Sequence, residues 1–220
     1  CLHNKGIKVE AIIDIRESSN SKIVKAVEKA GIKIYWSSTI VDTTGYKRLN
    51  SVSVMKLSND GLSVTGNKMN ISCDCLGVAG GWTPAVHLFT QSGGKLTFDE
   101  SDKVFLPNKY PSEQLSVGSC NGDFEIKKIV KNLSTNLKDF LKIDKTDFEN
   151  INVESEEETS KRNIWLLPSD KPIGKTKPFV DYQNDATAKD IKLALREGFR
   201  SIEHVKRYTT TGMGTDQGKL

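Results

Sequence analysis

The sequence predicts an α/β protein in which a βαβ unit and an antiparallel meander precede a long helix and a small helical C-terminal region. Residues 7–36 show the order strand, helix, strand, and residues 52–71 change to short strands separated by turn residues. Residues 179–220 carry two short helical patterns on either side of a glycine. Because a helix that joins two strands within about thirty residues makes them parallel, the first strands predict a sheet that helices cover.

The crossover consists of a strand at 7–14, a helix at 21–30 and a strand at 32–36. Asp14 ends the first strand, and Arg16 follows it. A carboxylate at this end of a strand is well placed to accept hydrogen bonds from an adenine ribose, and an arginine could pair with a phosphate. Both residues could equally be solvated turn residues, so the pattern leaves the two interpretations open.

The meander is predicted from short apolar stretches within 52–71 that are broken by turn signals at 59–61 and 66–67. Residues 75–79 then predict a buried strand that returns the chain to the sheet. It leads into the turn Gly80, Gly81, Trp82, Thr83 and Pro84, where Pro84 can start a helix over 85–90. This turn either packs beside a bound dinucleotide or only connects strand and helix.

A second glycine turn precedes the longest predicted helix. After a β pair at 95–98 and 103–106, a strand at 115–117 enters the turn, and apolar residues from Ile126 to Leu141 then follow a helical period. Backbone amides and a helix N-terminus at such a turn could hold a pyrophosphate or a ribityl chain. The residues of this turn are Gly118, Ser119, Cys120, Asn121 and Gly122.

The C-terminal region follows a connector at 142–178 that contains an acidic run at 154–158 and an apolar stretch at 164–167. Thr187 with Asp190 predicts a capped helix that Gly198 ends, and Ser201 can cap a second helix. The threonine- and glycine-rich tail that follows suits a phosphate or a carboxylate. Its candidate binding residues are Thr210, Thr211 and Lys219.

Composition narrows the functional classes. The 220 residues are 36% hydrophobic and 27% charged, with a net charge of +4, which describes an ordinary globular protein of one or two domains. No apolar run approaches the ~20 residues of a membrane span, and no signal peptide is seen, so we expect a cytoplasmic protein without membrane contact. The chain begins at Cys1 and stops at Leu220 without a natural cap, which predicts an interior fragment of a longer polypeptide.

The cysteines and histidines predict no catalytic or metal centre. Cys73 and Cys75 would share one side of a strand, where a mutual disulfide is awkward, so buried cysteines in a reducing compartment are expected. The three histidines are far apart in sequence and form no metal motif. A rival interpretation is a non-catalytic module whose basic helix pair at 187–208 contacts nucleic acid, but acids interleaved there dilute the positive field. We therefore expect no nucleic-acid partner.

The C-terminal residues 197–201, 204–210 and 212–219 resemble the heterotetrameric sarcosine oxidase alpha subunit, at the region that joins its dinucleotide-binding and folate-binding domains. The order βαβ, meander, return strand and glycine turn is similar to the nicotinamide-binding half of two-dinucleotide-binding flavoproteins. The resemblance implies an incomplete, N-terminally truncated FAD/NAD(P)-binding domain at 1–141, a linker at 142–178 and a small helical domain at 179–220.

The resemblance also implies an activity, namely oxidative demethylation of sarcosine with O2 by a multi-subunit enzyme. Its partners would be beta, gamma and delta subunits, with FAD in a partner, FMN at a subunit interface beside the Thr210–Thr211 tail, and folate in a downstream domain. Ser119 and Cys120 stand where flavoproteins of this type carry an acid, which favours NAD over a flavin at that turn. The alternative is a related dehydrogenase acting on proline, opines or dimethylglycine. Residues 142–220 contain no cysteine, which argues against relatives with an iron–sulfur cluster there.

Overall fold

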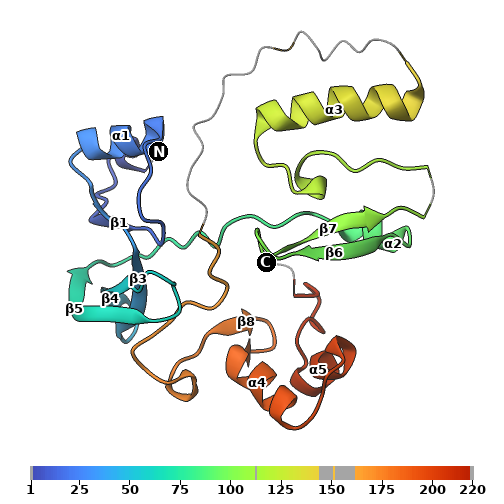
Figure 1. Cartoon of the computed structure of the whole chain (residues 1–220). Helices are drawn as coiled ribbons and strands as arrows, with labels where there is room; N and C mark the ends of the chain where they lie inside the picture. The colour runs from blue at the N-terminus through green and yellow to red at the C-terminus, as the bar shows by residue number, and fades with distance from the viewer. Residues whose placement is uncertain (1, 112, 144–150, 152–161, 219–220) are drawn as a thin grey trace. The chain divides into compact units, whose positions relative to one another are not determined.

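The computed structural model describes every residue except 1, 112, 144–150, 152–161 and 219–220 (Figure 1). The chain divides into two compact units. The first combines residues 1–36 with 73–163, and the second combines residues 37–72 with 164–220. Each unit is therefore built from two stretches of sequence, and the acidic run at 154–158 lies outside the described residues.

The predicted crossover is confirmed in the first unit. A 3-10 turn, η1 (His3–Lys5), precedes β1 (Ala11–Ile13), α1 (Lys22–Lys29) and β2 (Lys33–Tyr35). The two strands are parallel, with Ile12 opposite Ile34. Ser21 begins the helix because its Oγ accepts a hydrogen bond from the backbone N–H of Val24 at 3.3 Å. Both strands are shorter than the sequence pattern predicted.

The predicted return strand at 75–79 is wrong. Residues 73–86 belong to no helix or strand, and Val78 is 82% exposed. The strand predicted at 115–117 is also missing, so the parallel sheet has two strands within the described residues. A short apolar run becomes a strand only where a neighbouring strand completes its hydrogen bonds, and neither run finds such a neighbour.

The rest of the first unit follows the predicted order. The helix α2 (His87–Gln91) leads into the antiparallel pair β6 (Lys95–Asp99) and β7 (Val104–Lys109), then the 3-10 turn η2 (Gly118–Asn121) and α3 (Ile126–Leu141). Phe89 is buried, and its ring meets that of Tyr110 edge to face at 4.9 Å. Gly94 lies against the same ring, since a Cβ there would stand 2.4 Å from Phe89 Cζ.

The meander is confirmed and forms the sheet of the second unit. Strands β3 (Ser38–Gly45), β4 (Leu49–Leu57) and β5 (Val64–Ser72) are antiparallel, with β4 in the middle. The predicted turn at 66–67 is wrong, because these residues bulge within β5 opposite Met55 and Gly66 has a φ of 76°. The first strand escaped prediction because its polar residues show no clear alternation. The core of this sheet contains Ser38, Thr39, Val52, Val54, Met55 and Leu57.

The C-terminal part of the second unit is a small strand pair followed by two helices. Strands β8 (Phe179–Asp181) and β9 (Ala186–Thr187) are antiparallel, and α4 (Ala188–Arg196) and α5 (Ile202–Thr209) follow. The predicted cap of α4 is found: the carboxylate of Asp190 accepts from the backbone N–H and the hydroxyl of Thr187 at 2.8 and 2.7 Å. Ser201 stands at the N-cap position of α5, but its side chain makes no capping hydrogen bond. Gly198 ends α4 with a φ of 97°. Ala186, Ala194 and Val205 are the buried apolar residues here.

Two ion pairs connect the meander to the segment that precedes this strand pair. Lys171 pairs with Asp42 of β3, and Asp170 pairs with Lys68 of β5 at 2.7 Å. A further 3-10 turn, η4 (Ile173–Lys175), follows. The pairs are part-exposed, so they orient the segment more than they stabilise it. The apolar stretch before them stays open, with Trp165 60% exposed.

Candidate functional site

Asp14 and Arg16 hold each other in the loop after β1. The Arg16 Nη2 lies 2.6 Å from Asp14 Oδ2, its Nε lies 3.0 and 3.1 Å from the two oxygens, and its backbone N–H donates to Oδ1 at 2.9 Å. Partial burial would raise the pKa of Asp14, but the hydrogen bonds and charge of Arg16 outweigh it and lower the pKa. The pKa of Arg16 is raised by the same hydrogen bonds.

This pair stands where the crossover predicts ligand binding, at the carboxyl end of a parallel strand. The Asp14 backbone N–H donates to Tyr35 O at 3.0 Å, so the loop continues the pairing with β2. Arg162 Nη1 donates to Ile15 O at 3.0 Å and fixes the same loop. An ionised carboxylate can accept about four hydrogen bonds, so ribose hydroxyls could share Asp14 with Arg16.

The first glycine turn is open. A Cβ at Gly80 or Gly81 would meet nothing within 4 Å, and Trp82 is 82% exposed. Thr83 is exposed too, whereas Pro84 is buried. The helix begins later than predicted, with Val86 at its N-cap position. The segment therefore has the exposure that a docking loop needs, but the close packing of a tight strand-to-helix turn is not found.

The second glycine turn is closed on itself. Within η2 and its cap, the Gly122 N–H donates to Ser119 O at 3.2 Å and the Asp123 N–H donates to Gly118 O at 3.1 Å. These two amides are committed, so a phosphate at this turn would have to use other donors. Gly118 and Gly122 have φ values of 69° and 81°, which favour glycine. Ser119 is exposed, and Cys120 and Asn121 are half-buried.

The two glycine turns meet at Gly122. A Cβ there would lie 2.5 Å from Leu106 Cδ2 and 3.9 Å from Pro84 Cγ. Pro84 and the Gly118–Gly122 turn, two of the candidate groups predicted from the sequence, therefore lie side by side against β7. Glycine at this position lets them approach.

The threonine- and glycine-rich tail is held by Asp181, a residue that sequence reasoning missed. Asp181 is 1% exposed. Its Oδ2 accepts from the Gly212 N–H at 2.6 Å, and its Oδ1 accepts from the Asn184 N–H at 3.0 Å. The hydrogen bonds from Gly212 and Asn184 hold the pKa of Asp181 below its usual range, so the carboxylate stays ionised.

A second set of hydrogen bonds fixes the same tail. Asn184 Nδ2 donates to Thr210 O at 3.2 Å, and Gln183 Nε2 donates to Thr215 Oγ1 at 2.8 Å. The hydroxyls of Thr209 and Thr211 lie 2.8 Å apart. Thr210 and Thr211 are therefore placed by contacts within this unit, whereas Lys219 lies outside the described residues. An acid three residues before an asparagine in a turn was the available sequence signal.

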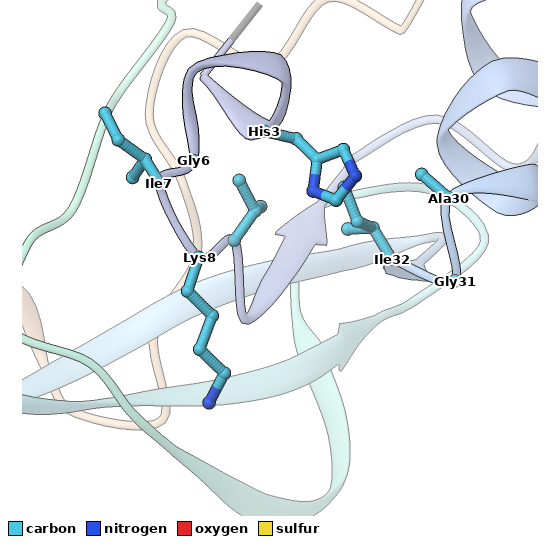
Figure 2. A pocket seen from close by; sticks show the side chains of 8 residues that line it. His3, Gly6, Ile7, Lys8, Ala30, Gly31 and Ile32 are labelled. Atoms are coloured by element: carbon cyan, nitrogen blue, oxygen red, sulfur yellow. The ribbon is translucent and has the colours of Figure 1, made fainter.

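An open hollow of about 290 Å³ lies in the first unit (Figure 2). Its wall consists of the segments that precede β1 and β2, and Figure 2 shows the Lys8 side chain extending away from the His3 ring. Ligands of βαβ units bind at the carboxyl ends of the strands, and this hollow lies at the opposite ends. The lining residues are His3, Gly6, Ile7, Lys8, Val9, Ala30, Gly31 and Ile32.

Two negative findings apply to the described part of the chain. Its His, Cys, Asp and Glu side chains form no group of three or more that could hold a metal ion. None of its helices combines the length and apolar character that crossing a bilayer requires.

The fold has a counterpart among solved structures. It is similar to the crystal structure of L-proline dehydrogenase from P. horikoshii, with a TM-score of 0.54 and 16% identity, over 99% of this chain and 43% of that chain. At this identity the likeness concerns the fold alone. It agrees with the predicted α/β class.

Sequence comparison shows which family the chain is similar to. Residues 175–220 match the model of the sarcosine oxidase A3 domain. Over 96% of its length the chain is 32% identical to the sarcosine oxidase subunit alpha of Corynebacterium sp. (strain P-1), and over 100% it is 32% identical to that of Rhizobium meliloti (strain 1021). The predicted resemblance to the sarcosine oxidase alpha subunit is thus confirmed. The chain spans only 22% and 21% of these relatives.

Proposed function

We propose that this chain works as part of the alpha subunit of a multi-subunit, flavin-dependent oxidase that demethylates sarcosine with O2. The observation that carries the proposal is the extent of the similarity: it runs through both compact units and does not stop at the A3 domain. A shared scaffold alone would not maintain 32% identity over segments as different as the crossover, the meander and the helical tail.

Within such an enzyme the described residues suit binding and assembly, and we assign them no catalytic step. Asp14, at the carboxyl end of β1, would accept hydrogen bonds from the ribose of NAD while Arg16 neutralises it. Gly80–Pro84 and the Gly118–Gly122 turn would lie against the dinucleotide. Thr210, Thr211 and Lys219 would contact the phosphate of an interfacial FMN. A bound flavin would accept the two electrons that sarcosine loses, with FAD in a partner subunit.

The activity is tested on the whole alpha subunit purified with its beta, gamma and delta partners. Sarcosine should drive hydrogen peroxide and formaldehyde formation in air, and proline, opines and dimethylglycine should be poorer substrates. Turnover confined to an artificial electron acceptor, or a preference for proline, would instead favour the dehydrogenase alternative. Supplying tetrahydrofolate, whose amines condense with formaldehyde and release water, should lower free formaldehyde if a folate-binding domain lies downstream.

The dinucleotide site is tested separately, by the NAD content of the same assembly. Asp14→Asn replaces a charged acceptor by an amide, and we expect NAD retention to weaken by roughly 10- to 150-fold, since a hydrogen bond to a charged group is worth roughly 1.5–3 kcal/mol. Glu17→Gln is the matched control, because Glu17 is exposed in the same loop. Equal NAD content in both variants would remove Asp14 from the site without touching the proposed activity.

The FMN contact has its own readout. Replacing Lys219 and Thr210 by alanine should lower the FMN content of the purified enzyme, because a cation and a hydroxyl are lost from the phosphate. Unchanged flavin content would exclude these residues as FMN contacts.

A further inference from the structure

Cys73 and Cys75 flank a single residue at the point where the chain leaves the meander. The sequence predicted buried strand cysteines here, and that prediction is wrong. Strand β5 ends at Ser72, Cys73 is half-buried, and Cys75 and the intervening Asp74 are exposed. Both thiols are free. This is also where the chain passes from the second compact unit to the first.

The missing strand removes the geometric objection to a disulfide between these cysteines. In an extended strand two residues advance about 6.6 Å, close to the upper limit of Cα separation for a disulfide, roughly 6.8 Å. Here the chain bends at Asp74, and no strand pairing holds residues 73–75 extended. A bend shortens the separation between its flanking residues, so the two sulfurs can come within bonding reach by local backbone adjustment.

We propose that Cys73 and Cys75 form a redox modification site that a hydroperoxide converts into an intramolecular disulfide. The exposed Cys75 sulfur attacks one oxygen of the peroxide and the O–O bond breaks. That oxygen stays on sulfur as a sulfenic acid, and the other oxygen leaves as water. The half-buried Cys73 sulfur then attacks the Cys75 sulfur, the S–S bond forms, and the sulfenic oxygen leaves as a second water. Two thiols and one hydrogen peroxide thus give one disulfide and two waters, with two electrons passing from sulfur to peroxide.

Cys120 provides an internal reference for this chemistry. It is half-buried within η2, it is free, and the sequence places no other cysteine near it in the chain. Its thiol has no neighbour in sequence that could resolve a sulfenic acid. Oxidation of Cys120 should therefore proceed to over-oxidised forms, while oxidation at Cys73 and Cys75 should stop at a reversible disulfide.

The test follows the two sites in separate tryptic peptides of the purified, natively folded chain. After exposure to hydrogen peroxide and quenching, the chain is denatured, alkylated with N-ethylmaleimide and digested. The peptide 69–95 should lose both alkyl adducts and be about 2 Da lighter than its reduced form, because two hydrogens are removed. Dithiothreitol before alkylation should restore both adducts. The peptide 110–127, which carries Cys120, should not show this reversible change.

Disulfide formation removes about one hydrogen from each thiol, which gives the loss of about 2 Da. The variants Cys73→Ser and Cys75→Ser should each abolish this loss and leave the remaining cysteine alkylated or over-oxidised. Cys120→Ser should leave the loss unchanged. Retention of both adducts on peptide 69–95 at a peroxide concentration that oxidises Cys120 would overturn the proposal. Cross-linked dimers on a non-reducing gel in place of the intramolecular product would overturn it as well. The wild-type measurement decides the question even if a variant folds poorly.

Discussion

At the scale of single residues, Asp181 has the largest consequence for the C-terminal region. Asp181 is the last residue of β8, and its carboxylate is buried. It accepts hydrogen bonds from Gly212, in the tail, and from Asn184, in the turn between β8 and β9. Burial of a carboxylate is unfavourable unless hydrogen-bond donors surround it, and these amides supply them. The tail that carries the candidate phosphate contacts is thereby fixed to the strand pair by one side chain.

We expect Asp181→Asn to loosen this tail. The carboxylate of Asp181 accepts from the backbone N–H groups of Gly212 and Asn184 through different oxygens. Asparagine has one accepting oxygen and one NH2 group, so one of these two N–H groups would face another donor and lose its hydrogen bond. The midpoint of thermal unfolding should fall by about 3–8 °C, and the Gly212 amide should exchange faster with solvent. Differential scanning fluorimetry and hydrogen exchange measure the two effects.

Asp185→Asn is the matched control, since it makes the same chemical change at an exposed position of the same turn. Its φ of 53° is a conformation that asparagine tolerates well, so its stability should stay close to the starting protein. If both variants unfolded at the same temperature, the carboxylate of Asp181 would not be the residue that fixes the tail.

At the scale of elements, α2 and the β6–β7 hairpin are joined through Gly94 and Phe89. A Cβ at Gly94 would meet three atoms of the buried Phe89 ring at 2.4, 2.5 and 2.7 Å. Gly94→Ala should therefore displace the ring from Tyr110 and lower the free energy of unfolding by about 1–3 kcal/mol, as overpacking does. Urea denaturation followed by tyrosine fluorescence measures it.

Gly80→Ala is the control for this prediction, because Gly80 also has an ordinary φ but its Cβ would meet nothing. It should change the free energy of unfolding by less than about 1 kcal/mol. The change can be an increase, because alanine leaves the unfolded chain fewer conformations than glycine does. Equal destabilisation by both variants would mean that lost glycine flexibility, and not the Phe89 contact, decides the outcome.

The start of α4 offers a second element-level prediction. Thr187 donates its hydroxyl and its backbone N–H to Asp190, which makes the first turn of the helix self-contained. Thr187→Ala should lower the free energy of unfolding by about 1 kcal/mol, whereas Thr187→Ser, which keeps the hydroxyl, should lose less. Chemical denaturation monitored by circular dichroism distinguishes them, and an alanine variant as stable as the serine variant would contradict the role of the hydroxyl.

At the scale of the whole molecule, hydrogen-bonded carboxylates determine how stability depends on pH. Several aspartates have a pKa below the ordinary value of 3.8, because hydrogen bonds or positive charges favour the ionised form. A lowered pKa in the folded state contributes stability above the unfolded value, and this contribution is lost as the pH falls through the folded pKa. The aspartates are Asp14, Asp42, Asp170, Asp181 and Asp190.

We therefore expect the urea midpoint to stay level from neutral pH down to about pH 4 and to fall steeply below 3.8. Raising the salt concentration should weaken the stabilisation by the part-exposed ion pairs Asp42–Lys171 and Lys68–Asp170, because salt screens exposed charges. The stabilisation by the buried carboxylate of Asp181 should change less. A large loss of stability between pH 5 and 7 would contradict this account, because all five aspartates have a pKa below 3.8.

Elements encoded by local signals were predicted well. The capping pair Thr187–Asp190 and the glycine at 198 located α4, and the long apolar period located α3. The β pair predicted at 95–98 and 103–106 is the β6–β7 hairpin. Among the candidate site residues, Asp14 and Arg16 were found at the end of β1, but their mutual ion pair was not anticipated. Spacing within a chain shows that two charged residues are near each other, yet it does not show which partner each one chooses.

The sequence by itself determined the crossover, the meander, the helices with their caps and the likeness to the sarcosine oxidase alpha subunit, because these depend on neighbouring residues or on long matching runs. Only the tertiary structure decided that residues 75–79 and 115–117 stay outside any sheet, that Pro84 packs beside Gly122, and that Asp181 fixes the tail. A strand needs hydrogen-bond partners and a buried carboxylate needs donors, and both are supplied by residues far away in the sequence.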